Sequence, residues 1–278
     1  MDKSPLTEHL GELRNRIFIS LGVVIVAFGA SFNYSENIFT MLTSPIHNDI
    51  HFSLNSPFIT FTPNKHSTMN LVFLAPAEAV WMHIKISFIS AFIVSSPVIF
   101  FEIWRFVAPG LLGKEKKYAL PFVFITTSLF LIGALFCFII ILPFAMNFLL
   151  NYKTENLQPM LSVGKYVDFC LKFILSFGAI FELPVLTVFL TRMGIVTPAF
   201  LAKNRKYAVL IAFVLAALLT PTPDAFNQSL MAIPIIILYE VGILASRILD
   251  RKKKEPDQED EEEKESEEED AEKKEEIE

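Results

Sequence analysis

A single acidic residue, Glu182, lies near the middle of the apolar run Phe173–Leu190, with Pro184 two positions behind it. A charged carboxylate at the centre of a bilayer costs about 2.5–3.5 kcal/mol on insertion scales, so this position calls for a chemical role. Two roles are open: a protonated acid satisfied inside the fold, or a polar contact point on a concave, partly hydrated side that engages partner helices or a peptide. Pro184 frees the carbonyl of Ile180, so we expect a helix kink.

The histidines, cysteines and known hydrolase motifs do not indicate an enzyme or a metal-binding protein. The five histidines lie outside the apolar runs, and the two cysteines, Cys137 and Cys170, lie singly inside them. Metal sites and disulfide frameworks need clustered or paired residues. The hydrolase patterns G-x-S-x-G and H-E-x-x-H do not occur in the sequence. We therefore expect no catalytic activity, no metal site and no cofactor.

A transporter is the alternative that the sequence leaves open. Ionisable residues inside a membrane mark ion paths, and Glu182 would lie on the path of an ion-coupled secondary transporter. Such a protein would normally carry several acids, or an acid paired with a base, at the middle of the membrane. Only Glu182 meets that description within the apolar runs.

Six long apolar runs must position these residues. The 278-residue chain is 53% hydrophobic and only 19% charged, below the roughly 25% charged residues of a soluble protein. A spanning helix needs about 20 predominantly apolar residues. We predict an all-α polytopic membrane protein with six transmembrane helices, of which the last two are short and joined by a tight outer turn. The runs are Ile17–Phe32, Ile86–Phe101, Leu120–Leu142, Phe173–Leu190, Ala208–Leu219 and Leu230–Leu244.

Basic residues predict the orientation of these helices. Sixteen Lys and Arg lie before the first run, in the second-to-third and fourth-to-fifth connections, and just after the last run, whereas Lys65, Lys85, Lys153 and Lys165 lie in the other connections. The positive-inside rule then places both termini in the cytoplasm, which requires an even number of spans. We expect the first helix to be retained, because its Ala27-Phe28-Gly29 is a weak cleavage site.

Two segments outside the runs have compositions of their own. The first outer segment, Asn33 to His83, contains four prolines and a partly alternating stretch, and we expect a folded cap of short helices or extended pieces. Residues 255–278 hold 16 Asp and Glu against three Lys, so residues 1–254 carry a net charge of +7 although the whole chain carries −6. We predict a transmembrane domain over residues 1–250 and an acidic, disordered cytoplasmic tail over residues 251–278.

Short motifs at the ends of the runs carry a family resemblance. In order, they are HLGELRNR (9–16), FEIWRFVAPGLLGKEKK (101–117), FGAIFELPV (177–185), LTPTPDAFNQ (219–228) and AIPIIILYEVG (232–242). Together they resemble the TatC family, the polytopic core of the twin-arginine protein translocase. The resemblance covers about residues 5 to 250. The chain departs from relatives in the lysines after Glu115, in one extra residue in TPTPD and in a longer first outer segment.

The resemblance implies a receptor in the cytoplasmic (inner) membrane. Members of the family bind signal peptides with two consecutive arginines, then recruit TatA- and TatB-like single-span proteins so that folded cargo crosses the bilayer. It also implies an oligomeric complex and no nucleic-acid partner. On this resemblance, Glu12 and Glu115 match the carboxylates that meet the twin arginines, and Arg14, Phe106 and Pro109 match residues of the same cytoplasmic surface.

The chemistry of these positions agrees with that role. A guanidinium presents a planar fork that pairs with a carboxylate at two points, which lysine cannot reproduce. Without the resemblance, Glu12 and Glu115 would be read as solvated charges. Phe106 has two equally supported roles: it could anchor the protein at the membrane interface, or it could contact the apolar part of a bound peptide.

The outer turn and the fourth run also match family positions. Asp224 and Gln228 lie in and after the outer turn, where a cap on the last helix is favoured for Asp224 over direct contact with partners. Glu182 and Pro184 match family positions too, which favours a contact with partner helices or the signal peptide.

Overall fold

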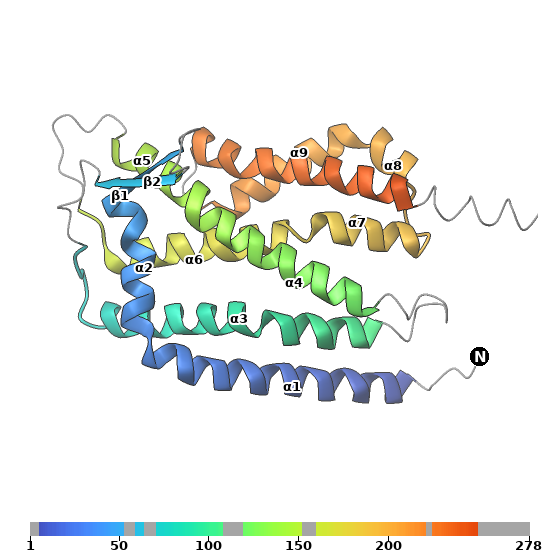
Figure 1. Cartoon of the computed structure of the whole chain (residues 1–278), viewed down its shortest axis with the longest axis horizontal. Coiled ribbons are helices and arrows are strands. Elements are labelled where there is room, and N and C mark those ends of the chain that lie inside the picture. The colour runs from blue at the N-terminus through green and yellow to red at the C-terminus, as the bar shows by residue number, and fades with distance from the viewer. Residues whose placement is uncertain are drawn as a thin grey trace, which may run out of the picture.

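The structure is a computed structural model, and it describes residues 6–52, 59–63, 71–107, 119–151, 160–220 and 224–249. These residues form a bundle of long helices (Figure 1). The elements are α1 (Leu6–Asn33), α2 (Ser35–His47), β1 (Asn48–Phe52), β2 (Ile59–Pro63), α3 (Glu78–Val107), α4 (Ala119–Phe136), a π-helical turn (Cys137–Ile141), α5 (Leu142–Asn151), α6 (Val163–Ile180), α7 (Leu183–Arg192), α8 (Pro198–Lys203), α9 (Arg205–Leu219) and a last helix (Ala225–Leu249).

The prediction of a helical membrane protein is confirmed. Within the described ranges, five helical segments are long and apolar enough to cross a membrane, namely Leu10–Asn33, Glu78–Val107, Pro121–Leu150, Val163–Arg192 and Ala225–Leu249. The remaining predicted run, Ala208–Leu219, lies in α9, which has 15 residues and is therefore about 22 Å long. One antiparallel hairpin departs from the all-α prediction, with Asn48 of β1 opposite Pro63 of β2.

The prediction that the last two helices are both short is wrong for the last one. That helix has 25 residues and extends beyond the apolar run Leu230–Leu244 at both ends. A helix satisfies its own backbone hydrogen bonds and therefore continues through polar residues whose side chains find partners. Near its start, the fully buried Asn227 donates to the carboxylate of Asp224 at 2.9 Å. Within the predicted run itself, Glu240 is paired with Arg205 of α9.

The helix that carries Glu182 is broken next to it. α6 ends at Ile180 and α7 begins at Leu183, with Pro184 in the first turn of α7. The kink predicted from Pro184 is therefore confirmed. α6 also begins ten residues before the predicted run Phe173–Leu190, because Ser162 caps its first turn by accepting from the Lys165 amide at 3.4 Å.

The core lies along α6 and α4. Phe173 and Phe177 of α6 are fully buried. Gly133 of α4 lies so close to α6 that a Cβ there would be 2.6 Å from the Phe177 carbonyl oxygen. A Cβ on Gly178 would be 2.7 Å from the ring of Phe130. Because both glycines lack a side chain, the two helices approach closely enough for their aromatic residues to interlock.

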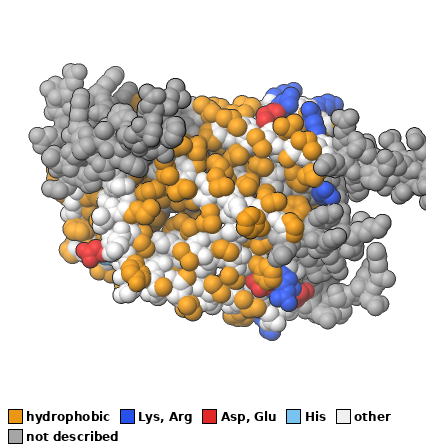
Figure 2. Space-filling view, viewed as in Figure 1, with side chains coloured by type: hydrophobic (Ala, Val, Ile, Leu, Met, Phe, Trp, Pro, Cys, Tyr) orange, Lys and Arg blue, Asp and Glu red, His pale blue; other side chains and the backbone are white. Residues whose placement is uncertain are grey.

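Large apolar side chains are also exposed around the bundle. α1 packs along α3 at one edge of the molecule (Figure 1) and leaves residues such as Phe18, Ile25 and Val26 exposed. Figure 2 shows apolar side chains over the middle of the visible face and charged ones near its ends. An apolar surface this extensive is typical of a protein that lies in lipid. The start of α1 and the end of the last helix lie at the same end of the bundle (Figure 1).

At the opposite end, one carboxylate joins two helices. Glu78, at the start of α3, accepts from the Leu74 amide at 2.6 Å and from the Gly164 amide at 2.7 Å, and the Ser162 hydroxyl donates to it as well. Val72 is bridged to Ser162 alongside. Glu78 therefore fastens the start of α3 to the start of α6. The same end carries α2 and the β1–β2 hairpin, within the segment for which the sequence predicts a cap.

Candidate functional site

An apolar groove runs between α1 and α3, with a cluster of paired charges at one end. Its volume is about 420 Å³. Apolar residues line most of it, and Arg16 and Glu102 provide the charges. The lining residues are Leu13, Arg16, Ile17, Ser20, Leu21, Val24, Phe88, Phe92, Ile99, Glu102, Ile103 and Phe106. The groove therefore combines an ionic end with a long apolar wall.

At the ionic end, one guanidinium contacts two carboxylates. Arg16 Nη1 donates to Glu102 Oε2 at 3.3 Å, and Arg16 Nη2 donates to Glu12 Oε1. Glu12 and Arg16 are four residues apart on α1, the spacing that places two side chains on one face of a helix. Glu102 reaches them from α3. Its side chain is 7% exposed, whereas that of Glu12 is 39% exposed, so the more accessible carboxylate is Glu12.

The structure brings two of the predicted peptide-binding residues to this groove. Glu12 belongs to its ionic end through Arg16, and Phe106 lines its wall. Arg14 is exposed on α1. Glu115 and Pro109 lie outside the described residues, as does the predicted tail, 251–278.

The sequence motifs did not predict that Arg16 and Glu102 would be part of the candidate site. A signal for Arg16 was present, since it follows Glu12 by four positions in the first motif. Glu102 follows directly on the end of the second apolar run, where an acid needs a cation from another helix. The sequence does not say which helix supplies that cation, because Arg16 lies 86 residues away.

Glu182 occupies the break between α6 and α7. Its backbone carbonyl accepts from the Leu186 amide at 2.8 Å, so it serves as the N-terminal flank of α7. Its carboxyl Oε1 is buried and has no hydrogen-bond partner among the described residues. Nearby, Pro184 is buried, and a Cβ on Gly242 of the last helix would be 3.3 Å from its Cα. A buried carboxyl oxygen without a partner is uncommon and needs an explanation.

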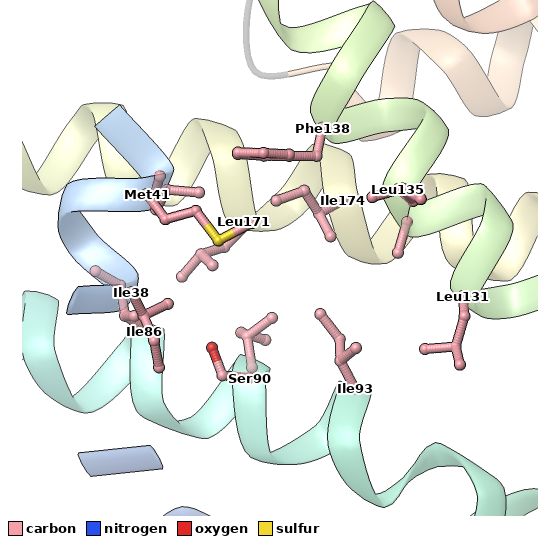
Figure 3. A pocket seen from close by; sticks show the side chains of 13 residues that line it. Ile38, Met41, Ile86, Ser90, Ile93, Leu131, Leu135, Phe138, Leu171 and Ile174 are labelled. Atoms are coloured by element: carbon pink, nitrogen blue, oxygen red, sulfur yellow. The ribbon is translucent and has the colours of Figure 1, made fainter. Parts of the chain in front are cut away.

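A second, almost wholly apolar cavity lies between α2, α3, α4 and α6 (Figure 3). Its volume is about 370 Å³. Met41 of α2, Leu135 of α4 and Ile174 of α6 surround it, and the hydroxyl of Ser90 points into it from α3. Phe138 of the π-helical turn closes one side. The cavity offers shape and apolar surface but little that could do chemistry.

The outer-turn residues hold the last helix in place. Asp224 Oδ1 accepts from the Asn227 amide at 2.7 Å, so the predicted cap on this helix is observed. Gln228 Nε2 donates to the Phe213 carbonyl of α9 at 3.0 Å. Glu240 of the last helix pairs with Arg205 of α9, whose Nε lies 2.7 Å from Glu240 Oε1.

Within the part of the chain that the structure describes, no group of three or more His, Cys, Asp or Glu side chains is placed to hold a metal ion. The two cysteines are buried and free. The groove itself offers ion pairing at Glu12, Arg16 and Glu102 and apolar contact along α1 and α3.

Comparisons with known proteins agree with one another. A family model described as Sec-independent protein translocase protein (TatC) matches residues 8–234. The chain is 39% identical over 258 residues to the Sec-independent protein translocase protein TatC of Desulforapulum autotrophicum, covering 93% of this chain and 90% of that protein. It is 40% identical over 253 residues to the same-named protein of Aquifex aeolicus, covering 90% of this chain and 98% of that protein. A crystal structure of the twin arginine translocase receptor TatC in DDM shares 37% sequence identity and has a TM-score of 0.72, covering 86% of this chain and 99% of that chain.

Proposed function

We propose, from the premise that this chain belongs to the TatC family of Sec-independent protein translocase proteins, that it is a membrane receptor for twin-arginine signal peptides. It binds these peptides on the cytoplasmic face and assembles with TatA- and TatB-type single-span proteins to export folded cargo. In this proposal it works in an oligomeric complex in the cytoplasmic membrane, without a catalytic activity or cofactor of its own.

The observation that carries the proposal is the ionic end of the α1–α3 groove. Glu12 is a partly exposed carboxylate already held in the geometry that a guanidinium recognises, because Arg16 donates to it. From there the groove continues along apolar residues of α1 and α3. A signal peptide with two arginines followed by an apolar stretch matches this order of polar and apolar surface.

Glu115 and Pro109 complete the peptide site in this proposal. Glu115 would supply the second carboxylate, and the lysines beside it would hold the loop to anionic headgroups, since each basic residue near such a surface contributes about 1 kcal/mol. Arg14 and Phe106 would belong to the same cytoplasmic surface. Two carboxylates from separate segments would distinguish arginine from lysine by the geometry of pairing.

The proposed topology has six spans with both termini in the cytoplasm. In support, α1 begins and the last helix ends at the same end of the bundle, and that end carries basic residues such as Arg105 and Arg205. α9, with 15 residues, would span the bilayer as a short helix. Bilayer thinning and the flanking Arg205 and Lys206 would accommodate its length.

Glu182 is the proposed intramembrane contact for partner helices or the signal peptide. Its buried Oε1 has no partner in the described part of the bundle, and it lies at the break between α6 and α7. A polar group of a partner helix would satisfy this oxygen. At the outer turn, Asp224 and Gln228 would shape a further partner surface by fixing the start of the last helix.

Site-specific photocrosslinking tests the receptor proposal. A photoreactive residue is placed singly at Leu13, Lys114 and Phe181, which are the neighbours of Glu12, Glu115 and Glu182, so that all three carboxylates are kept. The full chain is used, in membranes that contain the single-span partners, with and without a twin-arginine peptide. We expect peptide crosslinks from Leu13 and Lys114, and partner or peptide crosslinks from Phe181. The exposed Glu36 of α2 is the matched control position. Equal yields from Glu36 and Leu13 would contradict the proposal.

One observation also favours a second candidate, an ion-coupled secondary transporter. The unpartnered Oε1 of Glu182 could take up and release a proton inside the membrane. Two measurements separate the candidates. Deleting the gene would abolish export of a folded twin-arginine reporter if the chain is a receptor. Proton flux through the purified protein in liposomes, lost in Glu182→Gln, would support the transporter.

A further inference from the structure

The ionic end of the α1–α3 groove is already occupied by the chain itself. Arg16 donates to Glu12, the carboxylate that the proposed function assigns to an arginine of the signal peptide. A peptide arginine cannot pair with the same oxygen while Arg16 remains there. Binding at Glu12 must therefore displace a resident guanidinium.

Arg16 has a second carboxylate to which it can move. Glu102 is buried and lies 3.3 Å from Arg16 Nη1, longer than the 2.7–2.9 Å of a strong charge-assisted hydrogen bond. A small shift of the guanidinium towards Glu102 would bring Nη1, together with the Nη2 released from Glu12, into a two-point pairing with that carboxylate. The contact given up at Glu12 would thus be recovered at Glu102.

The charges favour the same exchange. Glu12, Arg16 and Glu102 together carry a charge of −1 when all three are ionised. One additional guanidinium would bring the summed charge of these three residues to zero. The incoming guanidinium goes to Glu12, because the Glu12 side chain is 39% exposed and the Glu102 side chain only 7%.

We infer that Arg16 is a resident competitor for Glu12, and that a peptide arginine binds by exchange, taking Glu12 while Arg16 moves onto Glu102. The inference rests on the proposed function and adds a specificity device to it. A ligand must pair with Glu12 better than a guanidinium already in place. An ammonium group, which lacks the planar fork, competes poorly, so the exchange favours arginine over lysine.

Peptide binding by charge-matched variants tests the exchange. The full chain is purified into lipid nanodiscs, and the affinities of a fluorescent twin-arginine signal peptide and of its twin-lysine counterpart are measured. The key variant is R16Q combined with E102Q, which removes the competitor together with its buried counter-charge and leaves the net charge unchanged. K85Q combined with D168N is the matched control, because it removes another ion pair between α3 and a neighbouring helix.

The expected changes have opposite signs. The R16Q/E102Q variant should bind the twin-arginine peptide about fivefold tighter, and its preference for arginine over lysine should fall. E102Q alone should weaken binding, since Glu12 is then the carboxylate that remains for Arg16. Structural damage would weaken both variants and could not produce this pattern. R16K keeps the charge pairing, so it carries the test if the double variant does not fold, and it should also bind the twin-arginine peptide more tightly.

The outcomes separate this inference from the proposed function. If the unsubstituted chain does not prefer the twin-arginine peptide, the proposed function fails and the exchange fails with it. If the unsubstituted chain shows the preference but R16Q/E102Q and R16K bind no more tightly, only the exchange is overturned. Equal gains in R16Q/E102Q and K85Q/D168N would overturn it as well, because the effect would not be specific to Arg16.

Discussion

Arg205 of α9 and Glu240 of the last helix form a two-point ion pair. Nε of Arg205 lies 2.7 Å from Oε1, and Nη2 lies 2.8 Å from Oε2. Arg205 is the first residue of α9, whereas Glu240 lies in the second half of the last helix. The pair therefore joins helices that run in opposite directions. Tyr239 beside it donates to the Leu201 carbonyl at 2.9 Å, which ties α8 to the same helix.

This pair should contribute little to stability. Both side chains are about half exposed, and ion pairs of this kind are worth about 0.5–1 kcal/mol. We expect R205Q to lower the free energy of unfolding by about that amount and E240Q to behave alike, with a smaller effect at high salt. Thermal unfolding in detergent measures it, and the double variant should cost no more than either single one. Additive losses would mean that the residues act independently.

Glu182 should tolerate replacement by an amide better than by a methyl group. E182Q keeps a hydrogen-bonding group at the break between α6 and α7, whereas E182A removes it. If the group works as a polar contact without needing its charge, export of a folded twin-arginine reporter should persist in E182Q and be strongly reduced in E182A. Equal and full export in both variants would show that this contact is dispensable.

The junction at Glu78 should be sensitive to one methyl group. In G164A, the new Cβ would lie 2.7 Å from Glu78 Oε1, and the carboxylate would have to leave its backbone donors. We expect a loss of about 1–3 kcal/mol in the free energy of unfolding, the usual cost of overpacking. G22A is the matched control, because a Cβ there has no neighbour within 4 Å. Since alanine favours a helix over glycine, G22A should be neutral or slightly stabilising.

Loss of either proposed peptide carboxylate should weaken peptide binding. E12Q and E115Q should each lower the affinity for a twin-arginine peptide by tenfold or more, since hydrogen bonds to charged groups contribute about 1.5–3 kcal/mol. Affinity for the twin-lysine peptide should change less. Fluorescence anisotropy with the full chain measures both, and E36Q on α2 is the control. Unchanged binding in E115Q would remove Glu115 from the site.

Several features of the fold could be predicted from short stretches of sequence. Five of the six apolar runs located helices that are long and apolar enough to cross a membrane, because burial in lipid depends on the composition of about 20 consecutive residues. Pro184 located the break in the fourth segment, and Asp224 the cap of the last helix, because both act on backbone groups within four residues. The length of the last helix could not be judged from hydrophobicity, since polar residues at its start, such as Asn227, are satisfied by partners such as Asp224.

The sequence by itself therefore determined the membrane helices, their main interruption and, through its ordered motifs, the family to which the chain belongs. Only the tertiary structure decided that Arg16 lies between Glu12 and Glu102, that Glu78 joins α3 to α6, and that Arg205 pairs with Glu240. The physical reason is the range of the interactions. Hydrophobic periodicity and helix capping act between neighbours in the chain, whereas an ion pair between helices depends on how each helix is rotated and packed against the others.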